Sequence, residues 1–588
     1  MKKVLLVLCI GLSGSLSSAL DIRIQYPTSG DSLSQNRIRL AGWVSDTTAQ
    51  LSVNGNIKRV YPTGAFVDLL NLVPGWNDFV IEAVSGVEQV SDTLRLYRIP
   101  PAPELPEAPV VFATERLLPA TDQIYHAPDM IIVQFQGSPG GRAFFEIDDL
   151  TEDPLPMEEL ATSASGGVRG IYRGSYFIGE RDGCDYEPVV FTLVGKNGDE
   201  EEWETDRHIT VKLDGQPLIA ETKSDNNIIF KAPWSEIIME LPAGVRLPVI
   251  AELGDWTKVC ISDGLTGLIS RRDVELLPSG TTYEPVSING FSSRIAEDWL
   301  IFSFRLGTRV PFDIRQNGNN QLVLDLYRTY MHDEWTTLAA EDAPGAPDSS
   351  FLDYFYWEQV SDEILRFKFH FQTRQLWGFR GWYEDNNFKL AVRIPPQIDP
   401  DAPFRNLIIA LDAGHGGDHP GAVGATGYME KEANLIYTLD LAELLREAGA
   451  QVILTRDTDT TMWLRARADT ARKYKAHILV WLHNNSIGST TDPLAVSGAS
   501  TYYTHLQGMH FALYVYPELL QLGLKPFGRV HRSYYITRQT DMVVFLVEGA
   551  FLSHPEDEMF LMDRANLKKL SQAVFNGMNS YLLSLAEK

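Results

Sequence analysis

Four polar residues in the last third of the chain lie where a metal centre could form. His415 follows the apolar run LIIALDA within a glycine-rich turn, and His483 ends the run HILVWL. Glu548 ends the run VVFLV, whereas Glu430 begins a helical stretch. Short continuous apolar runs predict buried strands of a parallel sheet, and active sites in open α/β sheets collect at the carboxyl ends of such strands. We therefore expect the four side chains to converge.

These residue types suit a catalytic metal ion. Two imidazoles and one carboxylate would give zinc three protein ligands and leave one coordination position for water. The second carboxylate could then act as a general base instead of a ligand. The helix dipole favours Glu430 at a helix start, and Glu548 would be costly at the end of an apolar run without a partner or a function.

Each of the four residues also has a structural explanation. A histidine after a strand can be a hydrogen-bonded loop residue, and a glutamate at a helix start can serve as a cap. Glu432 is the nearest rival to Glu430 as a metal ligand. The joint occurrence of four such residues at the ends of strands and helices favours the metal site.

The elements that must position these residues belong to an α/β domain, predicted over residues 404–588. Apolar runs alternate there with helical stretches, which we expect at 431–448, at 462–474 and from Asp563 onward. Continuous apolar strands that alternate with helices predict a mainly parallel sheet with helices on both faces.

Five segments of this region resemble a known family. In chain order they are LDAGHGGDHPGAVG, GYMEKEANLIYTLDLAELL, VILTRDTDTTMWLRARAD, WLHNN and FLVEGAFLSHPEDEMFL. In order and spacing they resemble the zinc-dependent N-acetylmuramoyl-L-alanine amidases, over residues 407–581. The resemblance implies a hydrolase that cuts the amide between N-acetylmuramic acid and the L-alanine of the stem peptide in peptidoglycan.

The resemblance also implies residue roles and one zinc ion as cofactor, with no organic cofactor. The implied zinc ligands are His415, Glu430 and His483, the implied catalytic residue is Glu548, and the implied substrate-binding residues are Asn434, Asn485 and Arg538. An alternative from another class is a peptidoglycan-binding scaffold that keeps this fold but is catalytically idle.

The front of the chain alternates apolar and polar residues in short runs, which predicts all-β modules. Residues 20–99, with the hairpin dipeptide at Asn54, resemble the Ig-like modules of exported carbohydrate-active enzymes. Residues 110–215 read as a second β-sandwich. Proline-rich linkers are expected at 98–109 and 393–403.

Two further β modules are predicted before the α/β domain. Residues 225–278, which contain GDWTKVCISDGLTGLIS, resemble a bacterial SH3-like barrel. Residues 284–396 resemble the AMIN modules that bind cell-wall polymers. Within them WLIFSFRL followed by QLVLDLY is echoed by ILRFKFHF followed by FKLAVRI, so we expect two duplicated halves, each with its own pair of strands.

The chain is strongly acidic, with a formal net charge of −26 over 588 residues. Nucleic acids and anionic membrane surfaces require basic patches, so both are poor candidates for partners. Only three cysteines are present, too few for a disulfide scaffold, and Cys184 and Cys260 are expected to be free thiols rather than a bridge.

The first 19 residues predict a signal peptide, with two lysines, an apolar core and small residues before a cleavage site. Cys9 suggests a lipoprotein as the alternative. No other run is long and apolar enough for a membrane span. We expect an exported protein of the periplasm, because the acidic chain would be repelled by a wall rich in teichoic acid.

Residues 484–499 form a polar stretch of Ser, Thr and Gly with no helical apolar pattern. Some periplasmic amidases carry an inhibitory helix at this position, so its absence predicts an unobstructed site. Control would then come from the front modules or from a regulatory protein partner.

Overall fold

The structure is a computed structural model of the chain. It describes residues 19–100, 104–126, 128–213, 218–278, 280–331, 338–339 and 351–586. Nearly all of the predicted signal peptide, including Cys9, lies outside these residues. The chain forms two compact units, of which one combines Met1–Pro101 with Pro396–Lys588 and the other is Ala102–Pro395.

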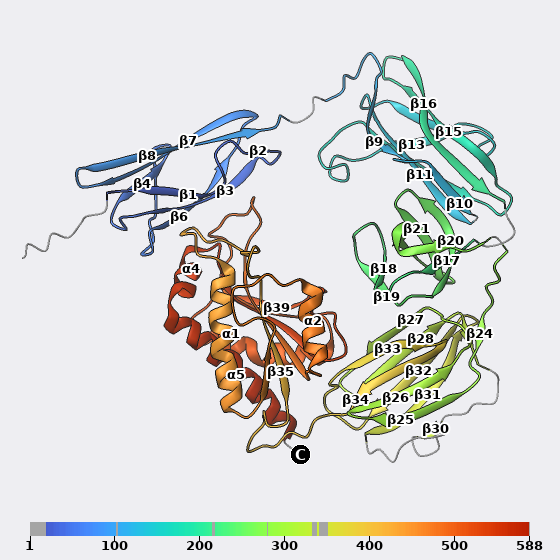
Figure 1. The fold of residues 1–588 in the computed structure, drawn as a ribbon. Coiled ribbons are helices and arrows are strands. Elements are labelled where there is room, and N and C mark those ends of the chain that lie inside the picture. The colour runs from blue at the N-terminus through green and yellow to red at the C-terminus, as the bar shows by residue number, and fades with distance from the viewer. Residues whose placement is uncertain are drawn as a thin grey trace, which may run out of the picture. The chain divides into compact units, whose positions relative to one another are not determined.

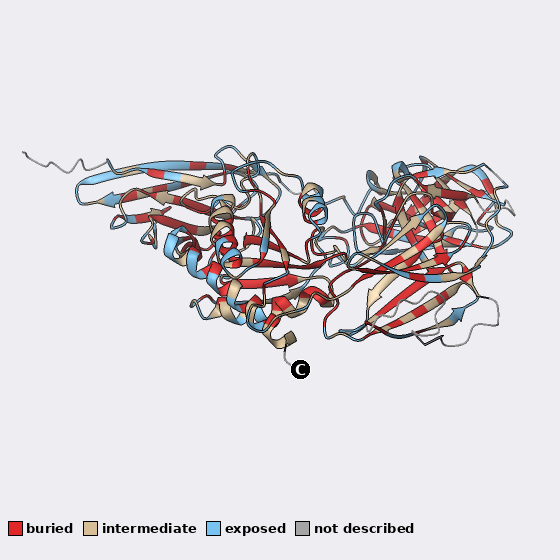
Figure 2. Ribbon diagram, turned by 60° about the horizontal axis from the view of Figure 1, so that its bottom comes forward, coloured by how far each residue is buried: buried red, intermediate tan, exposed pale blue. Residues whose placement is uncertain are grey.

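The C-terminal domain contains a six-stranded sheet in the order β36-β35-β37-β40-β38-β39. The strands are β35 (Ile408–Ala413), β36 (Gln451–Leu454), β37 (Ile478–Asn485), β38 (Ala499–Tyr503), β39 (Pro526–His531) and β40 (Val543–Phe551). The first four strands in this order are parallel, and β38 is antiparallel to β40. Strands β35, β37 and β40 are almost entirely buried, as their apolar runs require, so the predicted mainly parallel sheet is confirmed (Figure 2).

Helices cover this sheet on both faces (Figure 1). They are α1 (Glu430–Glu447), α2 (Leu464–Lys473), α3 (Leu506–Leu520), α4 (Pro555–Met562) and α5 (Arg564–Ala586). Helix α5 packs against α1 and α3, whereas Ala468 and Ala471 of α2 join a separate apolar cluster with Leu479 and Leu546 of the sheet. The predicted helices are confirmed, with ends within two residues of those expected.

The N-terminal module consists of two small sheets around one apolar core, which agrees with a β-sandwich. One sheet contains β1 (Ile22–Tyr26), β3 (Arg37–Val44) and β6 (Ala65–Asn71), and the other contains β2 (Ser32–Leu33), β4 (Gln50–Val53), β5 (Asn56–Lys58), β7 (Gly75–Ser85) and β8 (Glu88–Arg98). The Ig-like type of this module stays a prediction.

This N-terminal sandwich packs against the C-terminal domain, although more than 290 residues separate the two in the sequence. Tyr61 and Val67 are buried in one apolar cluster with Ala425, which lies in the loop between β35 and α1. The backbone N–H of Arg39 donates a hydrogen bond of 2.7 Å to the carbonyl of Ser489, in the loop after β37. Two loops of the C-terminal domain are therefore held by the sandwich.

The second unit is all β. Its first half contains β9 (Phe112–Leu118), β10 (Gln123–His126), β11 (Asp129–Gly137), β12 (Arg142–Ile147), β13 (Leu155–Glu159), β14 (Ile171–Ile178), β15 (Cys184–Val194), β16 (Glu200–Lys212), β17 (Ile219–Thr222), β18 (Asn227–Phe230), β19 (Ile237–Leu241), β20 (Arg246–Leu253), β21 (Trp256–Ser262), β22 (Leu265–Ser270), the 3-10 helix η1 (Arg271–Asp273) and β23 (Val274–Leu276). Strand β10 pairs with both β16 and β20, so hydrogen bonds run between the two modules predicted here. Cys184 and Cys260 are free thiols.

The second half of this unit contains β24 (Val286–Ser287), β25 (Phe291–Ala296), β26 (Trp299–Arg305), β27 (Phe312–Gln316), β28 (Gln321–Tyr327), β29 (Thr329–Tyr330), β30 (Leu338–Ala339), β31 (Leu352–Ser361), β32 (Ile364–Phe371), β33 (Phe379–Glu384) and β34 (Asn387–Arg393). The expected pairing within each sequence half is wrong. Strand β26 pairs with β34, and β28 pairs with β32, so each central pair joins one strand from each half. The phenylalanine-rich faces of both sheets thereby share one core.

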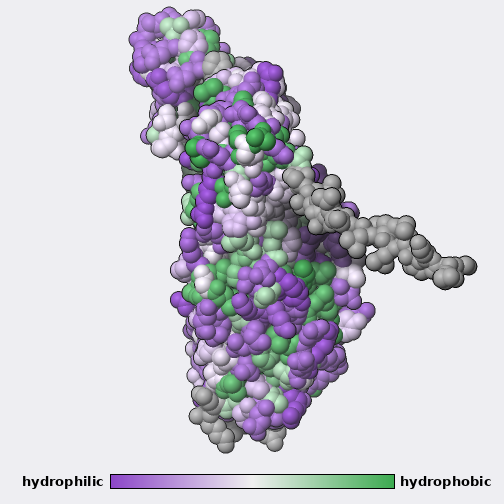
Figure 3. Space-filling model, turned by 90° about the vertical axis from the view of Figure 1, so that its left-hand side faces the viewer, coloured by the Kyte–Doolittle hydropathy of each residue, from purple (hydrophilic) through white to green (hydrophobic). Residues whose placement is uncertain are grey.

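Among the described residues no helix is long and apolar enough to cross a membrane. On the face drawn in Figure 3, hydrophilic side chains are interspersed with scattered hydrophobic ones, which agrees with the high content of acidic residues.

The contact between the N-terminal sandwich and the C-terminal domain can be tested at Tyr61. Tyr61→Ala removes a residue that is only 4% exposed, so we expect the free energy of unfolding to fall by about 3 kcal/mol. Urea denaturation of the full chain measures this change. Val87→Ala, at a fully exposed position of the same module, is the matched control. Equal stability of the two variants would show that the ring adds nothing at this contact.

Candidate metal centre

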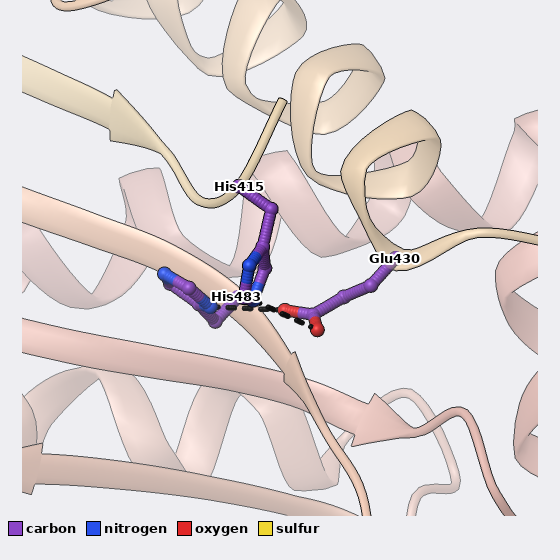
Figure 4. Close-up of side chains that lie close together, drawn as sticks. All are labelled: His415, Glu430 and His483. Atoms are coloured by element: carbon purple, nitrogen blue, oxygen red, sulfur yellow. Dashed lines mark hydrogen bonds and ion pairs between the residues drawn. The ribbon is translucent and has the colours of Figure 1, made fainter. Parts of the chain in front are cut away.

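Three predicted ligands converge at one point (Figure 4). Nε2 of His415 lies 3.1 Å from Oε2 of Glu430, and Nδ1 of His483 lies 2.9 Å from Oε1 of the same carboxylate. All three ligand atoms lie within 4.8 Å of one another. His415 comes from the turn after β35, Glu430 is the first residue of α1, and His483 lies near the end of β37.

The three residues fit a bound divalent cation. With bonds of about 2.0–2.1 Å, two ligands of a tetrahedral zinc ion lie about 3.3 Å apart, close to the spacings observed here. The side chain of His415 keeps 33% of its surface exposed, which leaves access from solvent. Nε2 of His483 and Oε2 of Glu548 are buried and have no hydrogen-bond partner within the protein, and orphaned buried polar atoms are typical of a site that receives a ligand.

The carboxylate of Glu430 is buried and held in its ionised form. The backbone N–H of Ala422 donates to Oε2 at 2.9 Å, and that of Asn484 donates to Oε1 at 3.1 Å. Burial alone would raise the pKa of Glu430, but the contacts with His415 and His483 lower the pKa below its usual range. A charged carboxylate is the form that binds a metal ion.

Glu548 lies beside His483 in the sheet, because β37 and β40 pair in a register that sets these two residues opposite each other. Of the nine residues of β40, Glu548 alone keeps part of its surface exposed, although its Oε2 atom is buried. Burial raises the pKa of Glu548 well above its usual range, and the nearby Glu430 carboxylate adds to the rise.

Asn434, predicted to bind substrate, is fully buried one turn after Glu430 in α1. Its amide nitrogen donates to Oε1 of Glu430 at 3.1 Å and to the carbonyl of Gly414 at 3.2 Å. The amide nitrogen of Asn484 donates to its oxygen at 2.8 Å. The amide of Asn434 thus holds the carboxylate of Glu430, a predicted metal ligand, in place.

The other two predicted substrate-binding residues do not join the group of three ligands. Asn485, at the end of β37, donates a hydrogen bond of 3.2 Å to the hydroxyl of Tyr502 on β38, two strands away in the sheet. Arg538 lies over the ring of Tyr535, and its carbonyl contacts the ring of His505.

Two buried arginines, neither of them predicted as a site residue, hold the backbone around His415. Arg456 donates to the carbonyls of Ala413 and Gly414 at 2.8 and 3.0 Å. Arg467 donates to the carbonyl of His415 at 2.7 Å and pairs with the buried carboxylate of Asp412 at 2.9 Å. Both arginines lie in the segment VILTRDTDTTMWLRARAD, so that segment contained the only sequence signal for them.

The ring of His483 is packed tightly from two sides. Trp481 lies edge-on to this ring, with ring centroids 4.5 Å apart. The hydroxyl of Tyr437 donates a hydrogen bond of 3.0 Å to the backbone carbonyl of His483. A Cβ atom at Gly414 would lie 2.1 Å from Nε2 of His483, so only glycine allows the ring to occupy this position.

Comparison with known proteins identifies this domain. The sequence profile of the family described as N-acetylmuramoyl-L-alanine amidase matches residues 409–580. The uncharacterized protein YqiI of Bacillus subtilis is 28% identical over 197 residues, which cover 33% of this chain and 93% of YqiI. The probable cell wall amidase LytH of Staphylococcus aureus is 29% identical over 205 residues, 34% of this chain and 67% of LytH.

A solved structure is also similar in sequence. The catalytic domain of CwlV, an N-acetylmuramoyl-L-alanine amidase from Bacillus (Paenibacillus) polymyxa, is 31% identical, with 30% of this chain and 98% of that domain covered and a TM-score of 0.28. Over residues 409–580 the chain belongs to the N-acetylmuramoyl-L-alanine amidase family. It is an amide hydrolase of this type, with the catalytic domain at its C-terminal end and β modules in front.

The packing of Gly414 against His483 can be tested by Gly414→Ala. The added methyl group would displace the imidazole, so we expect metal affinity to fall about tenfold or more while the domain stays folded. Gly488→Ala is the matched control, because its Cβ would have no neighbour closer than 3.9 Å. Bound metal, measured by elemental analysis after dialysis against a competing chelator, checks the outcome; equal metal content in both variants would contradict it.

The role of Asn434 can be separated from substrate binding. Asn434→Leu keeps the volume but removes the donor to Glu430, so we expect metal affinity to fall about 10–100-fold. Asn576→Ala, on an exposed turn of α5, is the control. If Asn434→Leu instead raised KM and left the affinity for metal unchanged, Asn434 would be a substrate contact.

Proposed function

We propose that this chain is an exported zinc-dependent amidase that cuts the bond between the lactyl group of N-acetylmuramic acid and the L-alanine of the stem peptide in peptidoglycan. The observation that carries the proposal is the convergence of His415, Glu430 and His483 around one point beside Glu548. Membership of the amidase family supports the choice of bond.

In this proposal His415, Glu430 and His483 hold one zinc ion. When bound, zinc would polarise an amide carbonyl and lower the pKa of a water molecule to about 7. The protein supplies the geometry, because both imidazoles are already oriented by the carboxylate of Glu430. The buried arginines and Asn434 keep that carboxylate and the loop of His415 from shifting.

Glu548 is the proposed general base and acid. Its Oε2 atom has no partner within the protein, so it is free to accept a proton from water and to return that proton to the departing amine of L-alanine. A divalent cation nearby would lower the pKa of Glu548, which burial and Glu430 raise in the protein alone. The proton balance therefore needs no other acidic side chain.

Export to the periplasm and binding to the cell wall belong to the same proposal. The predicted signal peptide over residues 1–19 and the acidic charge of −26 support an exported protein that reaches glycan by shape and aromatic contacts rather than by charge. The β modules in front of the enzyme are the proposed positioning elements, and residues 486–498, all of them described, form no helix that would cover the site.

The alternative is an idle scaffold that binds peptidoglycan without cutting it. The complete set of ligands and the unpaired oxygen of Glu548 favour the enzyme, because a scaffold has no need to keep a buried carboxylate without a partner.

Glu548→Gln decides between the two. We expect the variant to bind zinc as the wild type does and to release L-alanine amino termini from purified sacculi at least about 100-fold more slowly, because the amide cannot accept the proton. Glu432→Gln, at the exposed rival position, is the control and should retain activity.

Two outcomes would contradict this account. Unchanged turnover by Glu548→Gln would refute the assignment of the base. A zinc-loaded wild-type chain that releases no amino termini would establish the scaffold instead.

A further inference from the structure

A tryptophan stands exposed at the start of α2, a helix that is hydrogen-bonded to the loop of His415. Trp463 is 72% exposed, whereas Trp481, the other tryptophan of the C-terminal domain, is buried against His483. Trp463 is the residue that caps the N-terminus of α2, yet its side chain makes no capping hydrogen bond. Asn, Asp, Ser and Thr are the residues that stabilise this position, so the tryptophan costs helix stability and buries little apolar surface in return.

Short hydrogen-bonded links connect Trp463 to the loop that carries His415. The guanidinium of Arg467 donates at 2.7 Å to the carbonyl of His415 and at 3.2 Å to the carbonyl of Met462, the residue before Trp463. The backbone N–H of Asp418 donates to the hydroxyl of Thr461 at 3.1 Å. The segment before Trp463 and the loop that carries His415 and Asp418 are therefore joined by hydrogen bonds, and together we call them the rim.

A second link comes from the helix that begins with Glu430. The ammonium of Lys431 contacts the carbonyl of Gly417 at 2.8 Å and the carboxylate of Asp459 at 2.7 Å. Asp459 in turn accepts a hydrogen bond of 2.7 Å from the backbone N–H of Gly417. Both parts of the rim, the loop of His415 and the segment before Trp463, are thereby hydrogen-bonded to the start of α1, next to Glu430.

The ring of Trp463 has a defined partner and polar neighbours. His419, also exposed, lies edge-on to it with ring centroids 5.6 Å apart. The exposed carboxylate of Asp418 precedes His419 and can accept hydrogen bonds. A flat apolar face bordered by hydrogen-bonding groups suits a pyranose ring, which presents C–H bonds on its faces and hydroxyl groups at its edge.

We propose that Trp463 and His419 form a saccharide subsite, on which a sugar ring of the glycan strand stacks while the amide next to it reaches the metal centre. The inference rests on the proposed function, in which the bond that is cut is attached to a sugar through one lactyl group. A sugar ring must then lie close to the metal, and Trp463 is an exposed aromatic side chain rigidly joined to the metal loop.

The test compares two substrates with the full chain. One is a muropeptide with its glycan, and the other is the matching lactoyl-peptide, which has the same amide but no sugar ring. Trp463→Asn should lower kcat/KM about tenfold for the muropeptide and leave it unchanged for the lactoyl-peptide. Thermal stability should be retained or raised, because Asn is a favoured cap.

Two further variants make the test specific. Trp463→Phe should recover most of the lost kcat/KM, because it restores an aromatic face. Tyr474→Asn, at the opposite end of α2 and 45% exposed, should behave as the wild type with both substrates.

The results separate failure of this inference from failure of the proposed function. An equal loss on both substrates, or no loss on either, would overturn the saccharide subsite while leaving the amidase intact. A wild-type chain that cuts neither substrate would overturn the proposed function itself.

Discussion

Glu430 offers one carboxylate oxygen to each of two imidazoles, and the surrounding structure depends on keeping it there. A buried carboxylate is costly unless it is paired and hydrogen-bonded, so the contacts with His415, His483 and Asn434 must all be present together. The three predicted ligands come from a turn, the start of a helix and the end of a strand. Their convergence therefore requires the correct strand order and the correct placement of α1 on the sheet.

The support around this carboxylate is polar and buried. Arg456 and Arg467 donate several hydrogen bonds to the backbone around His415, a task that suits the rigid, many-donor guanidinium better than lysine. The loop between His415 and Glu430 is also held by contacts from other elements. Ala425 packs into the apolar cluster of the N-terminal sandwich, and the backbone N–H of Ala425 donates a hydrogen bond to the carboxylate of Glu558 in α4. The front module thus contacts the enzyme rather than serving only as a distant anchor.

The sequence predicted the elements of the α/β domain well, because long apolar runs and helical periodicity are local signals. It also predicted that the side chains of His415, Glu430 and His483 converge, because the carboxyl ends of parallel strands meet at one edge. The burial of Asn434 and the contacts of Arg467 were not predictable, since a hydrogen bond between residues distant in sequence leaves no local pattern. For the same reason, alternation revealed strands β26 and β28 but not that their partners are β34 and β32.

The central claim is that one ion is bound by two histidines and one glutamate in this peptidoglycan amidase. X-ray absorption spectroscopy of the zinc-loaded full chain tests it most directly, with elemental analysis of the same sample. The account predicts one zinc ion per chain, a first shell of nitrogen and oxygen at about 2.0–2.2 Å with the scattering of two imidazoles, and loss of one imidazole contribution in His415→Ala or His483→Ala. A shell that contains sulfur, or a spectrum that neither substitution changes, would contradict it.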